Sequence, residues 1–145
     1  LLSLIIGCTI GHTGDPAYRA SDKALMPPEF LALPAHLKEL SPSYRESYPE
    51  GLAAWREQAA LARTERMKVP PHNAITPEAL SQIQTPTLLF TGDADLYMPP
   101  SRLRAYAKYW SKPRVVVFQE AGHAPYWEQP MAFNRVLIEF LQSSQ

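Results

Sequence analysis

The fold is decided by the stretch at residues 118–130, which reads Phe118-Gln119-Glu120-Ala121-Gly122-His123-Ala124-Pro125-Tyr126-Trp127-Glu128-Gln129-Pro130. An apolar run at 115–118 leads into it and predicts a buried strand that delivers His123 to a loop. Apolar residues then recur at spacings of three and four from 131 to 141, which predicts an amphipathic helix. We therefore expect a strand, a histidine loop and a helix to close the chain. Open α/β sheets carry their chemistry at this end of a strand.

The composition is that of an ordinary globular domain. The chain has 145 residues, is 46% hydrophobic and balances 14 Lys and Arg against 14 Asp and Glu. The chain therefore has no excess of basic residues, which would be typical of a nucleic-acid binder, and its charge gives no support for a membrane-surface role. The single Cys8 forms no internal disulfide and supplies no thiolate metal cluster, so we expect no metal, no cofactor and a reducing, cytoplasmic location.

The first residues, Leu1-Leu2-Ser3-Leu4-Ile5-Ile6-Gly7-Cys8, predict a buried strand that extends to about Ile10. The run is too short to span a bilayer and lacks the flanks of a signal peptide. A buried strand at the first residue leads us to expect that the chain is the later part of something longer. An upstream segment or a companion chain would then complete the sheet.

The middle of the chain is divided by prolines. Those at 27, 28, 34, 42 and 49 predict only brief helices between Ala17 and Pro49. One longer amphipathic helix is predicted over 52–68, with Leu52 and Trp55 on its apolar face. We interpret this region as an inserted helical layer rather than a linker.

The pattern becomes regular again from Thr76. Thr76-Pro77 predicts the start of a short helix to about Ile83, and residues 85–91 predict a buried strand. A helix from Pro99 to Trp110 then leads to the strand before His123. Alternating strands and helices are typical of a parallel sheet, so this part of the chain is assigned to the α/β class.

Ionisable residues follow both strands of this parallel pair. Asp95 comes just after the first strand, and His123 comes just after the second. A right-handed crossover brings the two following loops to one edge of the sheet, where we expect the two side chains to meet. A carboxylate and an imidazole form two thirds of a nucleophilic triad.

From about Thr76 to Leu141 the sequence resembles the α/β-hydrolase superfamily. The resemblance rests on Pro86-Thr87-Leu88-Leu89, Gly92-Asp93-Ala94-Asp95, Pro99, Gly122-His123 and Glu128-Gln129-Pro130. It implies that Asp95 is the triad acid and His123 the triad base. It also implies the C-terminal part of an α/β-hydrolase fold, with parallel strands, flanking helices and a helical cap insertion. Residues 1–11 would form a core strand, 12–75 the cap or lid, and 76–145 the C-terminal part of the core domain.

One part of the family pattern is missing from this sequence. The nucleophile of such proteins sits in a Gly-x-Ser-x-Gly-like elbow between a strand and a helix. Here Gly7 and Gly11 flank Cys8 and Thr9, which lie at a strand end, and the oxyanion loop is also missing. We therefore expect the nucleophile to come from an upstream segment or a companion chain.

Other residues receive simpler interpretations. The four side chains that could line an apolar substrate pocket are Tyr97, Met98, Tyr126 and Trp127, although ordinary packing explains each equally well. Cys8 is interpreted as a small buried apolar residue. Glu128 is interpreted as structural, because an acid in the first turn of the last helix suits the helix dipole. His12, His36 and His72 lack the spacing of a metal site.

The predicted function is that of a hydrolase that acts on small, largely apolar esters or lactones without a cofactor. Two alternatives remain open. One is a dehalogenase or epoxide hydrolase, in which an aspartate is the nucleophile. The other is a non-catalytic, hydrolase-like domain that binds a small molecule or a protein partner. The identity of the nucleophile decides among them.

Overall fold

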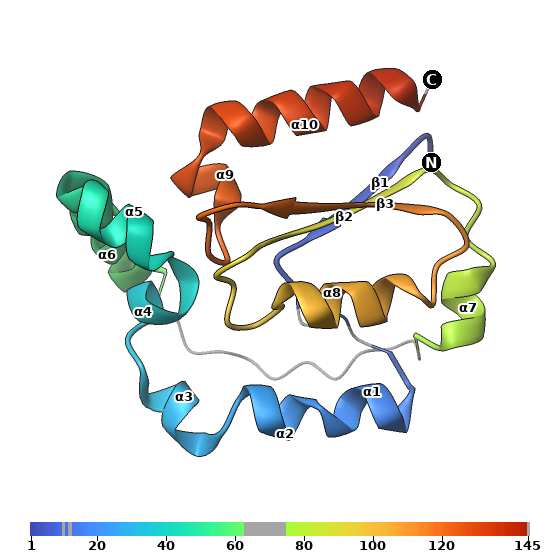
Figure 1. Ribbon diagram of the computed structural model, residues 1–145, viewed down its shortest axis with the longest axis horizontal. Helices are drawn as coiled ribbons and strands as arrows, with labels where there is room; N and C mark the ends of the chain where they lie inside the picture. Colours follow the sequence, from blue (N-terminus) through green and yellow to red (C-terminus); the bar gives the residue numbers. More distant parts are fainter. Residues whose placement is uncertain (10, 12, 63–74, 145) are drawn as a thin grey trace.

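Three parallel strands form the sheet of the computed structural model, which describes residues 1–9, 11, 13–62 and 75–144. The strands are β1 (Leu4–Gly7), β2 (Thr87–Gly92) and β3 (Pro113–Phe118), in the order β1-β2-β3. Helix α10 (Pro130–Ser143) covers one face of the sheet, and α8 (Pro100–Ala107) covers the other (Figure 1). This layered arrangement confirms the predicted α/β class and the parallel sheet.

The central strand β2 holds the core together because all six of its residues are buried. Leu89 belongs to the apolar cluster on the α8 face, together with Leu103 and Tyr106. Its neighbours Leu88 and Phe90 belong to the opposite cluster, which includes Phe118 and Phe140. Neighbouring residues of a strand point to opposite faces, so a continuous apolar run is the pattern expected for a strand covered on both sides.

The first strand is shorter than predicted. Pairing with β2 begins at Leu4, opposite Thr87, and the Leu4 amide donates to the Pro86 carbonyl at 2.9 Å. Leu1 and Leu2 are 92% and 87% exposed, because β2 extends no further in their direction. At the other end the backbone of Cys8 has φ of 50°, which leaves the extended region and ends the strand.

Prolines start helices in the middle region, as their fixed φ favours the first helical position. Within residues 13–62 the helices are α1 (Pro16–Ala20), α2 (Asp22–Leu25), α3 (Pro28–Ala32), α4 (Ala35–Glu39), α5 (Pro42–Ser47) and α6 (Pro49–Leu61). The predicted helix over 52–68 thus begins earlier and ends at Leu61, and its part from 63 onward lies outside the described residues. Helices α1–α3 run alongside α8, while α4–α6 lie beyond the carboxyl ends of the strands (Figure 1).

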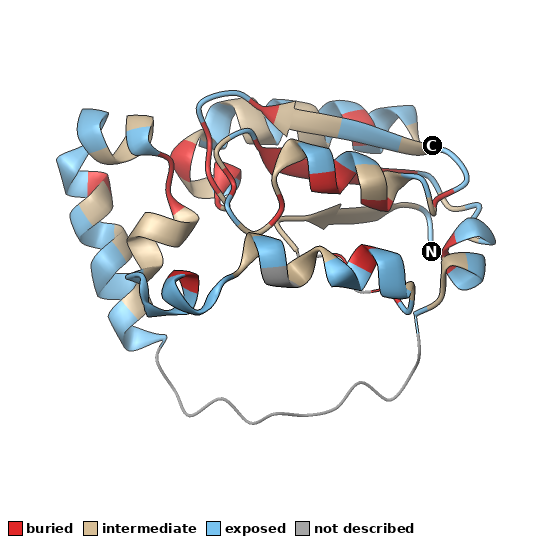
Figure 2. Ribbon diagram, turned by 60° about the horizontal axis from the view of Figure 1, so that its bottom comes forward, coloured by how far each residue is buried: buried red, intermediate tan, exposed pale blue. Residues whose placement is uncertain are grey.

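The burial of residues differs between the sheet with its covering helices and the helices of the middle region. Figure 2 shows buried residues gathered on β2, on the inner side of α8 and in the loops after β2 and β3. The helices of the middle region are largely exposed in the same view. No helix among the described residues is long and apolar enough to cross a membrane. The proposed boundaries of a cap at 12–75 stay a prediction.

Two short helices complete the chain. Helix α7 (Pro77–Ser81) begins as predicted, because the Thr76 hydroxyl accepts the Ala79 amide at 3.1 Å. Pro125 is the first residue of α9 (Pro125–Glu128), where its missing N–H costs no hydrogen bond.

Candidate active site

The Asp95 carboxylate lies in the loop after β2 and is almost completely buried, with 1% of the residue exposed. Its Oδ1 accepts the backbone amides of Tyr97 at 2.8 Å and Met98 at 3.0 Å. Its Oδ2 lies 2.9 Å from the Thr91 hydroxyl, whose proton is shared with the Met98 carbonyl oxygen at 2.7 Å. These contacts fix the carboxylate in one orientation.

Two opposing influences act on the pKa of Asp95. Burial alone would raise this pKa, but hydrogen bonding to His123, the charge of that imidazole and the bonds from Met98 and Thr91 outweigh it. The pKa is therefore lowered from its ordinary value, and Asp95 is ionised at neutral pH.

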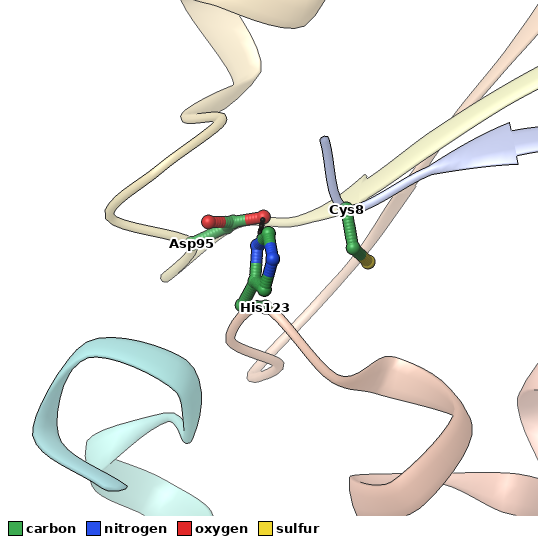
Figure 3. Close-up of side chains that lie close together, drawn as sticks. All are labelled: Cys8, Asp95 and His123. Atoms are coloured by element: carbon green, nitrogen blue, oxygen red, sulfur yellow. Dashed lines mark hydrogen bonds and ion pairs between the residues drawn. The ribbon is translucent and has the colours of Figure 1, made fainter. Parts of the chain in front are cut away.

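His123 meets this carboxylate from the loop after β3. Its Nδ1 lies 2.9 Å from Asp95 Oδ2, so the predicted hydrogen bond is present (Figure 3). An ionised carboxylate has no proton to give, and Nδ1 is therefore the protonated nitrogen of the neutral ring. This leaves the lone pair of Nε2 free to accept a proton, and the side chain is 23% exposed.

Main-chain contacts bring the two loops together. The Asp93 amide donates to the Phe118 carbonyl and the Ala94 amide to the Ala121 carbonyl, each at 2.9 Å. A Cβ on Gly92 would lie 2.0 Å from the Ala121 carbonyl oxygen, so only glycine fits there. The exposed Asp93 helps to hold the next loop, since its Oδ1 accepts the Ala121 amide at 3.3 Å.

Cys8 lies in the same corner, which the sequence interpretation did not foresee. Its thiol and one ligand atom each of Asp95 and His123 lie within 4.8 Å of one another (Figure 3). Burial, followed by the negative charges of Asp95 and Glu128, raises the pKa of this thiol, so it is protonated at neutral pH. Cys8 is only partly buried, and its positive φ leaves no signal in the sequence.

These three side chains include the types that bind zinc, but their hydrogen bonds argue against a metal centre. Both oxygens of Asp95 already accept two hydrogen bonds each, within the four sites that a carboxylate offers. The arrangement is better described as an acid–base pair with a neighbouring thiol.

The four predicted substrate residues lie in different surroundings. Tyr97 packs on the base, with 4.6 Å between its ring centre and that of His123. Met98 is completely buried in the core cluster with Leu89, which agrees with the alternative of ordinary packing, and its role in substrate binding stays a prediction. Its backbone amide donates to Asp95.

The other two candidates follow His123 on α9. Tyr126 is 49% exposed and its ring lies 6.1 Å from that of Phe133 on α10. Trp127 faces the middle region instead, where its ring lies edge-on to Trp55 of α6 at 5.2 Å. Roles in substrate binding stay predictions for Tyr97, Tyr126 and Trp127.

Glu128 and the other histidines were also interpreted from the sequence. Glu128 ends α9 and is not in the first turn of α10, so the helix-dipole explanation was wrong. Its carboxylate instead accepts the backbone amides of Gly122 and Ser41. His36 lies on α4 with its Nε2 2.9 Å from an Arg56 nitrogen, while His12 and His72 lie outside the described residues.

Several known proteins resemble this chain in sequence or in fold. A curated relative, the putative carbamate hydrolase RutD of Pseudomonas savastanoi pv. phaseolicola, is 34% identical over 65 residues, which are 45% of this chain and 25% of that protein. A thermophilic esterase from Thermogutta terrifontis superposes with a TM-score of 0.72 at 22% identity, over 99% of this chain and 57% of that one.

A second solved structure has the same shape. It is the putative non-heme bromoperoxidase BpoC of Mycobacterium tuberculosis, with a TM-score of 0.70 at 19% identity, over 100% of this chain and 59% of that one. The chain thus spans little more than half the length of the solved structures that it matches. Residues 3–136 match the profile described as "Alpha/beta hydrolase family", and the chain belongs to this α/β hydrolase family.

Proposed function

We propose that this chain carries the acid and the base of a hydrolase that cleaves small, largely apolar esters or lactones. The observation that supports the proposal best is the hydrogen bond between His123 Nδ1 and Asp95 Oδ2. It leaves Nε2 as the free base at the carboxyl edge of the sheet, where α/β enzymes place their reacting groups. The membership of a hydrolase family agrees with this chemistry.

The pair acts through two proton transfers in each half of the reaction. His123 Nε2 takes the proton of a nucleophilic hydroxyl while the hydroxyl oxygen attacks the ester carbonyl. The resulting imidazolium gives this proton to the departing alkoxide, and an acyl-enzyme remains. Water then repeats the sequence and releases the acid. Asp95 keeps the proton on Nδ1 and stabilises the imidazolium, without being protonated itself.

We further propose that the nucleophile and the oxyanion donors come from a segment or companion chain beyond these 145 residues. The sequence contains no Gly-x-Ser-x-Gly elbow. Within the described residues β1 pairs with β2 alone, so its second edge is available to another strand. With a serine nucleophile the same acid and base would cleave esters and lactones. With an aspartate they would open epoxides or displace halide.

The substrate class rests on the polarity of the site and on the relatives. Tyr97 covers one side of His123, and an apolar acyl group suits such an aromatic surface. The names of two relatives, a carbamate hydrolase and an esterase, both describe attack on an acyl carbonyl bound to a heteroatom. A serine-type mechanism is therefore the form of the proposal that we favour.

The experiment compares the full-length protein with its His123→Ala and His36→Ala variants. We expect hydrolysis of p-nitrophenyl acetate or butyrate, or of a small lactone, and a loss of about 10³-fold or more in His123→Ala. His36 lies on α4 and serves as the matched control, with activity expected to stay within about twofold. Melting temperatures of all three should agree within a few degrees, because neither ring belongs to the core clusters.

Other outcomes would decide against the proposal. Turnover of epoxides or haloalkanes without ester hydrolysis would indicate the aspartate mechanism. Activity that survives in His123→Ala would remove His123 as the base. A protein that is inactive on the whole panel, yet binds a small molecule or a partner, would favour the non-catalytic alternative.

A further inference from the structure

Glu128 connects the histidine loop to the helices beyond the sheet. Its Oε1 accepts the amide of Gly122 at 2.7 Å, and its Oε2 accepts the amide of Ser41 at 2.8 Å. Gly122 immediately precedes His123, whereas Ser41 lies between α4 and α5 and is completely buried. One carboxylate thus joins two segments that are 87 residues and six residues away from it in sequence.

The two segments also contact each other directly. The His123 amide donates to the Glu39 carbonyl at 2.8 Å. A Cβ on Gly122 would lie 2.7 Å from both the Glu39 carbonyl oxygen and the Ser41 nitrogen, so no other residue fits this approach. The Ser43 hydroxyl adds a hydrogen bond to the carboxylate of Glu120. The backbone at Gly122 and His123 therefore packs directly against residues 39–41.

The chemistry of the contact requires the carboxylate form. Two backbone N–H groups converge on Glu128, whose residue is only 9% exposed, and each bond to an ionised oxygen is charge-assisted. A glutamine has one carbonyl oxygen and one NH₂ group, so one of the two amides would face another donor. Such a buried, unpaired N–H is costly.

We propose that Glu128 is a positioning residue, which sets the place of His123 relative to Asp95 by fixing the Gly122 amide against the α4–α5 junction. Glu128 does not contact the reacting atoms. It acts through the backbone of the histidine loop, so its loss should displace the imidazole while leaving the acid in place. The effect on turnover rests on the proposed hydrolase function, whereas the effect on the imidazole does not.

The test uses Glu128→Gln in the full-length protein, with Glu46→Gln, on the exposed side of α5, as control. The first measurement is NMR of the His123 Nδ1 proton and of amide hydrogen exchange at Gly122 and Ser41. We expect a shifted or broadened Nδ1 signal and faster exchange at both amides in Glu128→Gln. Glu46→Gln should match the parent protein.

The second measurement is kinetic. A displaced base reduces the stabilisation of the transition state more than it reduces the affinity for substrate. We therefore expect kcat to fall about 10- to 100-fold while KM changes about twofold or less. Glu128→Asp keeps the charge, but its side chain is one methylene shorter. Its kcat should lie between that of the parent protein and that of Glu128→Gln. A role in stability alone would lower the melting temperature and leave kcat per folded molecule unchanged.

The two measurements separate the possible failures. An unchanged Nδ1 signal with unchanged exchange at Gly122 and Ser41 would overturn the positioning role, whatever the activity. If the parent protein hydrolyses nothing but the NMR changes appear, the positioning role stands and the proposed hydrolase function fails. A changed NMR signal with unaltered kcat would overturn the claim that this position matters for catalysis.

Discussion

The segments 75–144 and 13–62 are held in place by different means. The first contains two strands of the parallel ladder, and apolar side chains such as Leu88 and Leu89, which are 1% and 0% exposed, form its core. The second consists of six helices, of which α6 is the longest at 13 residues, and it leaves side chains such as Leu31 68% exposed. Extensive apolar burial stabilises the first segment, and the second depends more on its contacts with the first.

Those contacts combine aromatic packing with polar side chains. Tyr18 of α1 joins the core cluster of the other segment, and Trp55 packs against Trp127. The Tyr109 hydroxyl donates to Asp15, which caps α1, at 2.6 Å, and Arg102 binds Ser21 and Asp22. Glu128 provides a further polar connection, to Ser41. The acid–base pair thus lies within the segment 75–144, while aromatic and polar contacts hold the other helices against it. Activity and stability should therefore respond to different substitutions.

Asp95→Asn should have the largest effect on activity. An amide at this position can hold the wrong imidazole tautomer, and the corresponding change in a serine protease costs about 10⁴-fold in kcat. We expect a comparable loss of ester hydrolysis by the full-length protein. Asp93→Asn is the control, and it should cost less than about tenfold, because the exposed Asp93 side chain accepts the Ala121 amide at 3.3 Å and an asparagine keeps an oxygen there. If the two variants exchanged their effects, the assignment of the acid would be wrong.

Leu89→Ala should have the largest effect on stability. Truncation of this fully buried side chain is expected to lower the free energy of unfolding by about 2–5 kcal/mol. Leu31→Ala, on the exposed side of α3, should change it by less than about 0.5 kcal/mol. Urea unfolding of the full-length protein measures both. Equal losses in the two variants would contradict the view that apolar burial stabilises the segment 75–144 more than the segment 13–62.

Asp22→Ala should have a smaller effect, at the connection between the two segments. The Arg102 side chain is 4% exposed and would lose its carboxylate partner, at an expected cost of about 1–3 kcal/mol. The same urea titration measures it, with Glu29→Gln on α3 as a control that should stay within about 0.5 kcal/mol. No change in Asp22→Ala would indicate that this ion pair does not hold α2 against α8.

The sheet could be predicted from the sequence because its signals are local. Residues 88–90 form a continuous apolar run between Pro86 and Gly92, and the structure places β2 over Thr87–Gly92. Asp95 and His123 follow two adjacent parallel strands, so their meeting follows from the crossover rule. Thr76-Pro77 likewise carries its own capping signal.

Other features depend on contacts that are distant in sequence. Met98 is completely buried in the core cluster, and apolar character alone does not distinguish a residue of a pocket wall from one of the core. The role of Glu128 depends on Ser41, which is 87 residues away. The position of Cys8 beside the base depends on its φ of 50°, which a non-glycine residue rarely adopts.

The close approach at Gly92 has a consequence for how such a site can change over time. The acid and base loops touch through main-chain atoms, with two hydrogen bonds between backbone groups just beyond the strands. The two loops are thus held together by the peptide backbone, and the carboxylate of Glu128 also holds the histidine loop. Substitutions of side chains that contact neither loop can change stability and leave the pair in register. A methyl group at position 92 would force the loops apart.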